Sequence, residues 1–144
     1  MRTFALLSLL ALAGCAHVAS TSGTFTQRPG VPLVLKLTRH LDTVVQGPDV
    51  EEDQTLIVEL RRIAIGQRIN IPSDDAAAAF QAERFGPTTR GETYRGLIVV
   101  RSVSKEQVVA TLKLEIDARS SGGSYSQKVR FNDDYTFHRE APRD

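Results

Sequence analysis

Residues 108–118 read VVATLKLEIDA, and every second side chain of this stretch is apolar. One parity carries Val108, Ala110, Leu112, Leu114, Ile116 and Ala118. The other carries Val109, Thr111, Lys113, Glu115 and Asp117. Successive side chains of a β-strand point to opposite faces, so this alternation predicts a strand with one face against a core and one against water. The fold is therefore expected to be built from half-buried strands.

The chain after this strand continues in the same way. Residues 120–124, SSGGS, are typical of a flexible hairpin loop. The next inward row is expected to hold Tyr125, Gln127, Val129 and Phe131. Residues 132–134, NDD, are expected to turn the chain before Tyr135 and Phe137 end the sheet. These aromatic side chains are interpreted first as core, with a ligand groove as the alternative.

Upstream segments also alternate, with two irregularities. Residues 33–45 predict a strand in which Arg39 interrupts the apolar parity, indicating a bulge or an exposed strand end. Residues 56–65 predict a strand whose apolar parity switches near Arg61 and Arg62, which a second bulge would explain. A short strand is expected at Ile69 and Ile71, and a longer one over residues 94–103, whose apolar run 97–100 could be buried on both faces.

Residues 73–87, SDDAAAAFQAERFGP, favour two structures. A possible N-cap, four alanines and the final Gly-Pro are typical of a short helix over about residues 73–85. The neighbouring segments are all predicted strands, and tertiary context overrides local propensity. The interpretation leans to strand.

Strands at short spacing with polar turns predict an all-β domain over residues 24–144. We expect a single antiparallel β-sandwich, or a barrel-like sheet, of about seven to eight strands. Over residues 92–139 the order of elements is a G-x-x-V-V strand, a polar turn, a long alternating strand, a glycine-rich loop and an aromatic strand. This order is loosely similar to small β-sandwich domains of bacterial lipoproteins.

The first residues, MRTFALLSLLALAGC, have a positive start and a short apolar run. This pattern is typical of a secretory signal, and the run is shorter than the roughly 20 residues of a spanning helix. Residues 12–15, Leu-Ala-Gly-Cys, resemble the lipobox of bacterial lipoproteins. The resemblance implies a signal peptide over residues 1–14, cleavage before Cys15 and a diacylglycerol on the Cys15 sulfur, with further acylation of the new amine.

Other features near Cys15 agree with this resemblance. Cys15 is the only cysteine of the chain, so the domain has no internal disulfide. By resemblance to the sorting rule of lipoproteins, Ala16 implies the outer membrane, facing the periplasm. Residues 15–23 are expected to form the lipidated cysteine and a flexible tether, in which His17 is a solvated residue.

Composition argues against a nucleic-acid partner. The chain has 18 basic and 17 acidic side chains, and loss of Arg2 with the leader makes the two numbers equal. A nucleic-acid binder is expected to show a basic excess or stripe. The expected partners are the membrane, through the lipid on Cys15, and an envelope protein. The sequence does not predict the oligomeric state.

No motif predicts a catalytic residue, a metal site or a cofactor. Residues 49–53, DVEED, resemble part of a calcium loop, but the glycine and glutamate of the EF-hand are replaced by Gln54 and Leu60, so a solvated acidic loop is expected. Neither His40 nor His138 is accompanied by a second ligand at zinc spacing. The weak candidates for a ligand site are His40, Tyr125 and Tyr135.

The leading hypothesis is a membrane-anchored periplasmic lipoprotein without enzymatic activity, whose β-domain has a binding or structural role at the cell envelope. The first alternative is a module that binds a lipid or another small hydrophobic ligand. The second is an envelope hydrolase. It requires His40 or His138 to meet an Asp, Glu or Ser within hydrogen-bond reach in a cleft.

Overall fold

The computed structural model describes residues 16–43, 50–84, 88–123 and 125–142, and these residues form eight strands and no helix. A helix long and apolar enough to span a membrane is therefore not found in the described part of the chain. The strands are β1 Ala16–Thr26, β2 Leu33–Thr43, β3 Val50–Leu60, β4 Arg68–Ile71, β5 Ala76–Arg84, β6 Thr89–Val103, β7 Gln107–Ser120 and β8 Ser126–Arg139.

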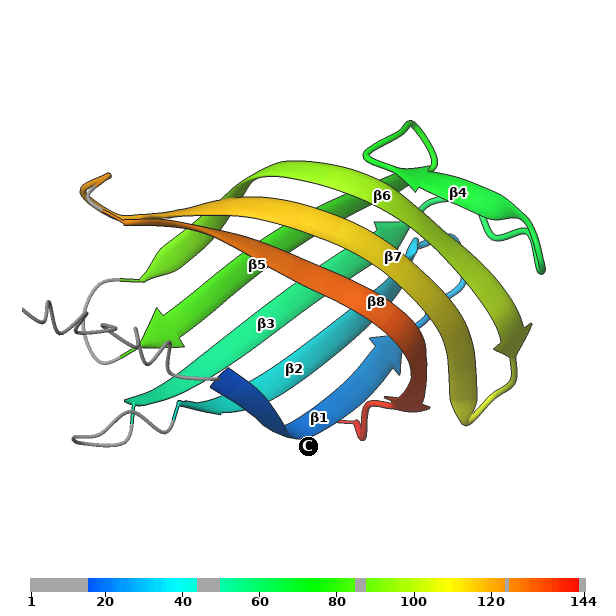
Figure 1. Ribbon diagram of the computed structural model, residues 1–144. Coiled ribbons are helices and arrows are strands. Elements are labelled where there is room, and N and C mark those ends of the chain that lie inside the picture. Colours follow the sequence, from blue (N-terminus) through cyan, green and yellow to red (C-terminus); the bar gives the residue numbers. More distant parts are fainter. Residues whose placement is uncertain (1–15, 44–49, 85–87, 124, 143–144) are drawn as a thin grey trace, which may run out of the picture.

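Seven of the strands form one closed sheet, and β4 adds to β6 (Figure 1). The sheet order is β4-β6-β5-β3-β2-β1-β8-β7, and a further pairing of β6 with β7 closes it. The expectation of an all-β domain with seven to eight strands is confirmed. Of the two expected architectures, the single closed sheet corresponds to the barrel and not to a sandwich of two separate sheets.

The barrel consists of two antiparallel walls. One wall is β1-β2-β3-β5, in which β2 and β3 share eleven paired positions. The other is β6-β7-β8, in which β7 has thirteen paired positions with each neighbour. In β7 the row from Val108 to Ala118 is buried, as predicted from its alternation. Ile98, Val99 and Val100 are all buried, which confirms burial on both faces for that part of β6.

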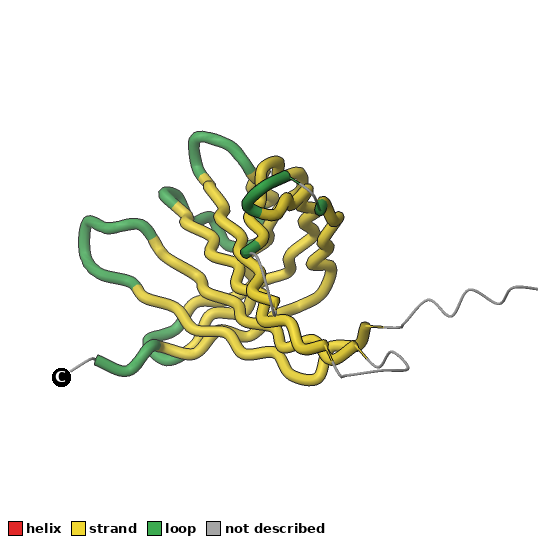
Figure 2. The backbone as a smooth tube through the Cα atoms, turned by 90° about the vertical axis from the view of Figure 1, so that its left-hand side faces the viewer, coloured by secondary structure: helices red, strands yellow, loops and turns green. Residues whose placement is uncertain are grey.

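The two walls meet at two short seams. The first seam joins β5 to β6 by two pairs, and the second joins β1 to β8 by two parallel pairs. Gly23 allows the close approach of β1 and β8, because a Cβ there would lie 2.7 Å from the Thr136 carbonyl oxygen. Within β6, Gly91 leaves space for the Tyr94 hydroxyl, which a Cβ on Gly91 would approach to 2.3 Å. Figure 2 shows the strands bending to enclose the interior, with loops at their ends.

The interior changes character along the barrel. At the end where β1 finishes it holds buried apolar side chains, among them Phe25, Leu33 and Phe137. At the end where β1 begins it holds the buried polar side chains Glu52, Gln54, Thr89 and Ser120. The Glu52 carboxylate accepts hydrogen bonds from the amides of Gln54 at 3.2 Å and Gln127 at 3.1 Å. Buried polar groups need such partners, so this end is held by a network.

The structure corrects the expected tether. Residues 16–23 belong to β1, which pairs antiparallel with β2 from Ala16 to Thr26. Their small polar side chains contribute little apolar burial, but backbone hydrogen bonds to β2 hold the segment in the sheet. A bulge lies in β1 between Val18 and Ser20.

Several expected irregularities also differ from the structure. Arg39 causes no bulge in β2; its pairing with β3 is continuous, and Arg39 stays on the inward row. The strand expected over 56–65 ends at Leu60, so the parity switch reflects a bend and not a bulge.

The turn expected at 132–134 is wrong, because β8 pairs with β7 without interruption there. Residues 73–87 contain β5, so the strand alternative is confirmed and the helix is wrong.

Candidate functional site

The three candidate ligand residues lie apart from one another. His40 is on the outer face of β2, Tyr135 is half-buried inside the barrel, and Tyr125 precedes β8 with 46% of its surface exposed. Phe131 and Phe137 are fully buried, and Tyr135 packs against Phe131 edge to face at 6.5 Å. The core interpretation is confirmed for these three aromatics and is wrong for Tyr125.

A cluster of ligand-type side chains surrounds His40. The register of β2 with β3 opposes His40 to Asp53 and Asp42 to Glu51. These four residues have the parity opposite to the inward residues Leu37 and Leu56, so they share the outer face. Cross-strand neighbours have Cβ atoms about 5 Å apart, so the fold itself brings the four side chains together.

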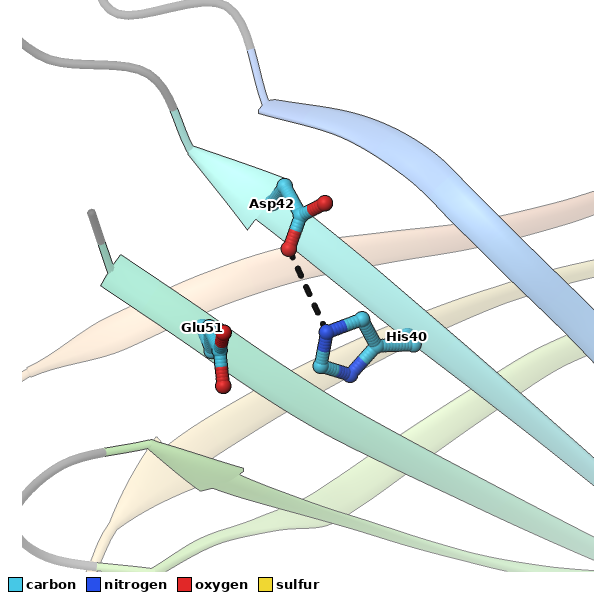
Figure 3. Close-up of side chains that lie close together, drawn as sticks. All are labelled: His40, Asp42 and Glu51. Carbon is cyan, nitrogen blue, oxygen red and sulfur yellow. Dashed lines mark ion pairs between the residues drawn. The ribbon is translucent and has the colours of Figure 1, made fainter.

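Figure 3 shows the side chains of His40, Asp42 and Glu51 close together on the outer face of β2 and β3. The His40 Nδ1 lies 2.6 Å from Asp53 Oδ1, and the His40 Nε2 lies 3.2 Å from Asp42 Oδ1. Ligand atoms of His40, Asp42 and Glu51 all lie within 4.8 Å of one another. The His40 and Asp42 side chains are about one-third exposed, at 32% and 38%. The cluster is therefore open to solvent ions.

The hydrogen bond to Asp53 raises the pKa of His40 above its ordinary value, and the charges of Asp53, Asp42 and Glu51 act in the same direction. Two species suit this geometry. A protonated imidazole donates to Asp53 and to Asp42. A neutral imidazole with its proton on Nδ1 instead directs the Nε2 lone pair toward carboxylate oxygens, which requires a cation between them.

The sequence interpretation missed this cluster. It found no ligand partner for His40, yet Asp42 lies two residues along the same strand face and β3 supplies Glu51 and Asp53. The expected acidic loop is also wrong where it is described, since Glu51–Asp53 are part of β3; Asp49 lies outside the described residues. The strand period of two was the available signal. His138, by contrast, is exposed near the end of β8, opposite Gln107.

A second polar group lies inside the barrel. Arg39 donates from Nη2 to Gln54 Oε1 at 2.6 Å and from Nη1 to the Arg130 carbonyl at 3.0 Å. Its guanidinium stacks 3.7 Å from the Phe131 ring centroid. Burial lowers the pKa of Arg39 and raises that of Tyr135. Because Arg39 joins β2 to the free edge of β8, it has a structural role at the second seam.

A groove lies on the outside of the first seam. It has a volume of about 480 Å³. Its apolar part is formed by Ile57, Phe80 and Tyr94, and two cations, Lys36 and Arg90, also line it. The Tyr94 hydroxyl accepts a hydrogen bond from the Phe80 backbone N–H at 2.8 Å, and burial raises the pKa of Tyr94. This groove offers an apolar surface beside positive charge.

Comparison of the chain with family models, curated proteins and solved structures finds no match.

Proposed function

We propose that this chain is a lipid-anchored protein of the bacterial cell envelope whose barrel binds another envelope component through its outer surface, without catalysing a reaction. The observation that carries the binding mode is the filled interior. Phe25, Phe131 and Phe137 are at most 1% exposed and occupy the space that a carrier barrel would leave for its ligand. Binding is therefore assigned to the outside.

The anchor is supported by the lipobox at residues 12–15 and by the absence of any other cysteine in the sequence. Two or more acyl chains on Cys15 would give stable attachment, whereas one chain binds only marginally. Because β1 begins at Ala16, a lipid on Cys15 would hold the polar end of the barrel next to the membrane surface. By resemblance, Ala16 favours the periplasmic face of the outer membrane.

The seam groove is the proposed binding surface. Ile57 is 39% exposed in it, and Lys36 and Arg90 add positive charge. Exposed apolar surface rimmed by polar groups is typical of interaction sites. The expected partner therefore presents an apolar segment next to acidic groups.

The anchor is tested by labelling cells with a radioactive fatty acid. The wild-type chain should carry the label and sediment with membranes, whereas Cys15→Ser should lose both properties. Equal labelling of the two chains would contradict lipidation at Cys15.

Partner binding is tested by placing a photo-crosslinking amino acid at Ile57, with the exposed Val103 of β6 as the matched control position. A discrete adduct that forms from Ile57 only, and that Arg90→Glu weakens, is the expected result. Recovery of the uncrosslinked chain from both positions, under several growth conditions, would contradict a partner in the groove.

The same groove supports a second candidate function, the binding of a small hydrophobic ligand. Its volume of about 480 Å³ lies within the range of small-molecule sites, roughly 300–1,000 Å³. Native mass spectrometry of the freshly purified chain separates the two candidates. A retained ligand adds a discrete mass, which Tyr94→Ala should reduce, and an unmodified mass favours the protein partner.

A further inference from the structure

The strand register brings a histidine and two carboxylates to one spot on the outer face of β2 and β3. We propose that His40, Asp42 and Glu51 form a site for a divalent transition-metal ion of the zinc type. This inference goes beyond the proposed function, since it depends on neither the lipid nor the seam groove.

The distances suit such an ion after small side-chain rotations. Zinc binds imidazole nitrogen and carboxylate oxygen at about 2.0–2.2 Å in tetrahedral geometry, so two ligand atoms on one ion lie roughly 3.5 Å apart. The His40 Nε2 and the Asp42 Oδ1 are already 3.2 Å apart. Here the three ligand atoms are already within 4.8 Å of one another. Glu51 is exposed, so its carboxylate has space to move toward the other two.

Asp53 supplies the orienting contact that metal-binding histidines usually have. It accepts the Nδ1 proton of His40 at 2.6 Å, so the imidazole presents Nε2 to Asp42. A carboxylate bound to the second ring nitrogen fixes the tautomer and makes the ligand nitrogen more basic. Asp53 is thus a positioning residue, and the other three are ligands.

The neighbouring strand carries a further imidazole. In the β1–β2 ladder His17 is directly opposite Asp42, and it is exposed. Directly opposed residues of an antiparallel pair share a face, so His17 lies on the same outer surface as the cluster. His17 is not among the three residues whose ligand atoms lie within 4.8 Å of one another, so it would complete two nitrogen and two oxygen donors only after its side chain moves toward them.

The donor set decides the class of ion. Imidazole nitrogen suits zinc, nickel, copper and iron, whereas calcium and magnesium prefer oxygen donors alone. Three carboxylates around one imidazole also favour a dication electrostatically. The site should therefore prefer Zn²⁺ to Ca²⁺ and Mg²⁺.

The test is titration of the full chain, purified in mild detergent and stripped with EDTA, using ZnCl₂ in a calorimeter and CoCl₂ with visible absorption. One equivalent should bind, and Co²⁺ should give d–d bands. His40→Ala and Asp42→Asn should weaken binding by about 100-fold or more, because loss of an orienting residue alone costs about 10–100-fold. Asp53→Asn should weaken Zn²⁺ binding by only about 10–100-fold, because Asp53 orients a ligand and does not bind the ion. His17→Ala should change the Co²⁺ spectrum.

Two matched controls lie far from the cluster. His138→Ala removes an exposed histidine near the end of β8, and Glu59→Gln removes an exposed outer-face carboxylate near the end of β3. Both should bind Zn²⁺ like the wild type, as should Cys15→Ser. Circular dichroism of each variant verifies that it is folded.

Three results would overturn the metal site. The first is Zn²⁺ binding that His40→Ala and Asp42→Asn leave unchanged. The second is Ca²⁺ or Mg²⁺ binding as tightly as Zn²⁺. The third is no Zn²⁺ binding by a folded wild-type chain, in which case the cluster is a protonated histidine held between carboxylates.

Discussion

The walls of this barrel and its seams are closed by different means. In the β6-β7-β8 wall, thirteen paired positions join β7 to each neighbour, and the backbone itself supplies the hydrogen bonds. At each seam only two pairs join the strands. There, long polar side chains continue the bonding: Tyr94 reaches the β5 backbone, and Arg39 reaches the β8 backbone.

This difference suggests that the walls of a small barrel provide its stability, whereas the seams provide surfaces for binding. A long ladder buries most of one row of side chains and leaves little exposed backbone, even with the two register shifts between β6 and β7. A seam leaves edge backbone groups that side chains must satisfy, and it leaves room for a groove, as between β5 and β6. We therefore expect substitutions in a wall to act on global stability and substitutions in a seam to act more locally.

The largest effect is expected inside the β7 wall. Leu114 is buried, so Leu114→Asp places a charge among apolar side chains and should unfold the protein. Lys113→Asp, one residue earlier on the exposed face, should change the free energy of unfolding by less than about 0.5 kcal/mol. Urea unfolding followed by circular dichroism measures both. Equal effects would show that the assigned faces of β7 are wrong.

The walls were also the part of the fold that alternation could predict. The rows in β7 and β2 follow the period of two because one face of each is buried along most of its length. The seams could not be predicted, since the pairing of β1 with β8 joins opposite ends of the chain. Alternation of apolar residues cannot predict a strand that has no apolar row, such as residues 16–23.

The candidate sites show the same limit. His40 and Asp42 are visible on one strand face in the sequence, but the approach of Glu51 and Asp53 depends on the β2–β3 register. Residues 44–49 separate the two strands in the sequence, and Gly47-Pro48-Asp49 in this segment indicates a turn without fixing its length, so the register could not be predicted. Arg39 was interpreted as an irregularity because the sequence of one strand does not show whether a polar residue in an apolar row has a polar partner inside the barrel. Here that partner is Gln54.

The second-largest effect is expected at the β1–β8 seam. Arg39→Met removes the donors to Gln54 and to the Arg130 carbonyl, and should lower the free energy of unfolding by about 2 kcal/mol. Lys36→Met, on the outer face of the same strand, is the control and should stay within about 0.5 kcal/mol. Chemical denaturation compares the two. An unchanged Arg39→Met midpoint would mean that the backbone alone holds this seam.

A smaller and more local effect is expected at the β5–β6 seam. Tyr94→Phe keeps the ring but removes the hydroxyl that accepts the Phe80 N–H, at a cost of about 1 kcal/mol. Amide hydrogen exchange at Phe80 should accelerate strongly, while exchange of amides in the middle of β7 should accelerate only as far as the loss of global stability requires. Uniform acceleration across the barrel would contradict a local role for Tyr94.

The smallest effect is expected on the outer surface of the strong wall, where charges cross β6, β7 and β8. The Glu115 carboxylate contacts Arg130 at 3.0 Å, Lys128 at 3.2 Å and Arg95 at 3.0 Å. These contacts lower the pKa of Glu115 from 4.5 to about 2, and the hydrogen bond from Arg130 has the largest effect. A carboxyl whose pKa is lower in the folded state than in the unfolded state stabilises the fold fully at pH values above its unfolded-state pKa. This stabilisation is lost as the pH falls through the folded-state pKa.

Glu115→Gln should therefore be less stable than the wild type at pH 7, and the difference should shrink as the pH falls from 4.5 toward 2. Unfolding by urea at pH 7, 4 and 3 measures this, and the effect should weaken with added salt because the Glu115 side chain is partly exposed, at 28%. In an Arg130→Gln background the same substitution should have a smaller effect, because the main contact is already absent. A difference that is independent of pH would assign the effect to packing and not to charge. In that case backbone pairing, without help from surface charge, distinguishes this wall from the seams.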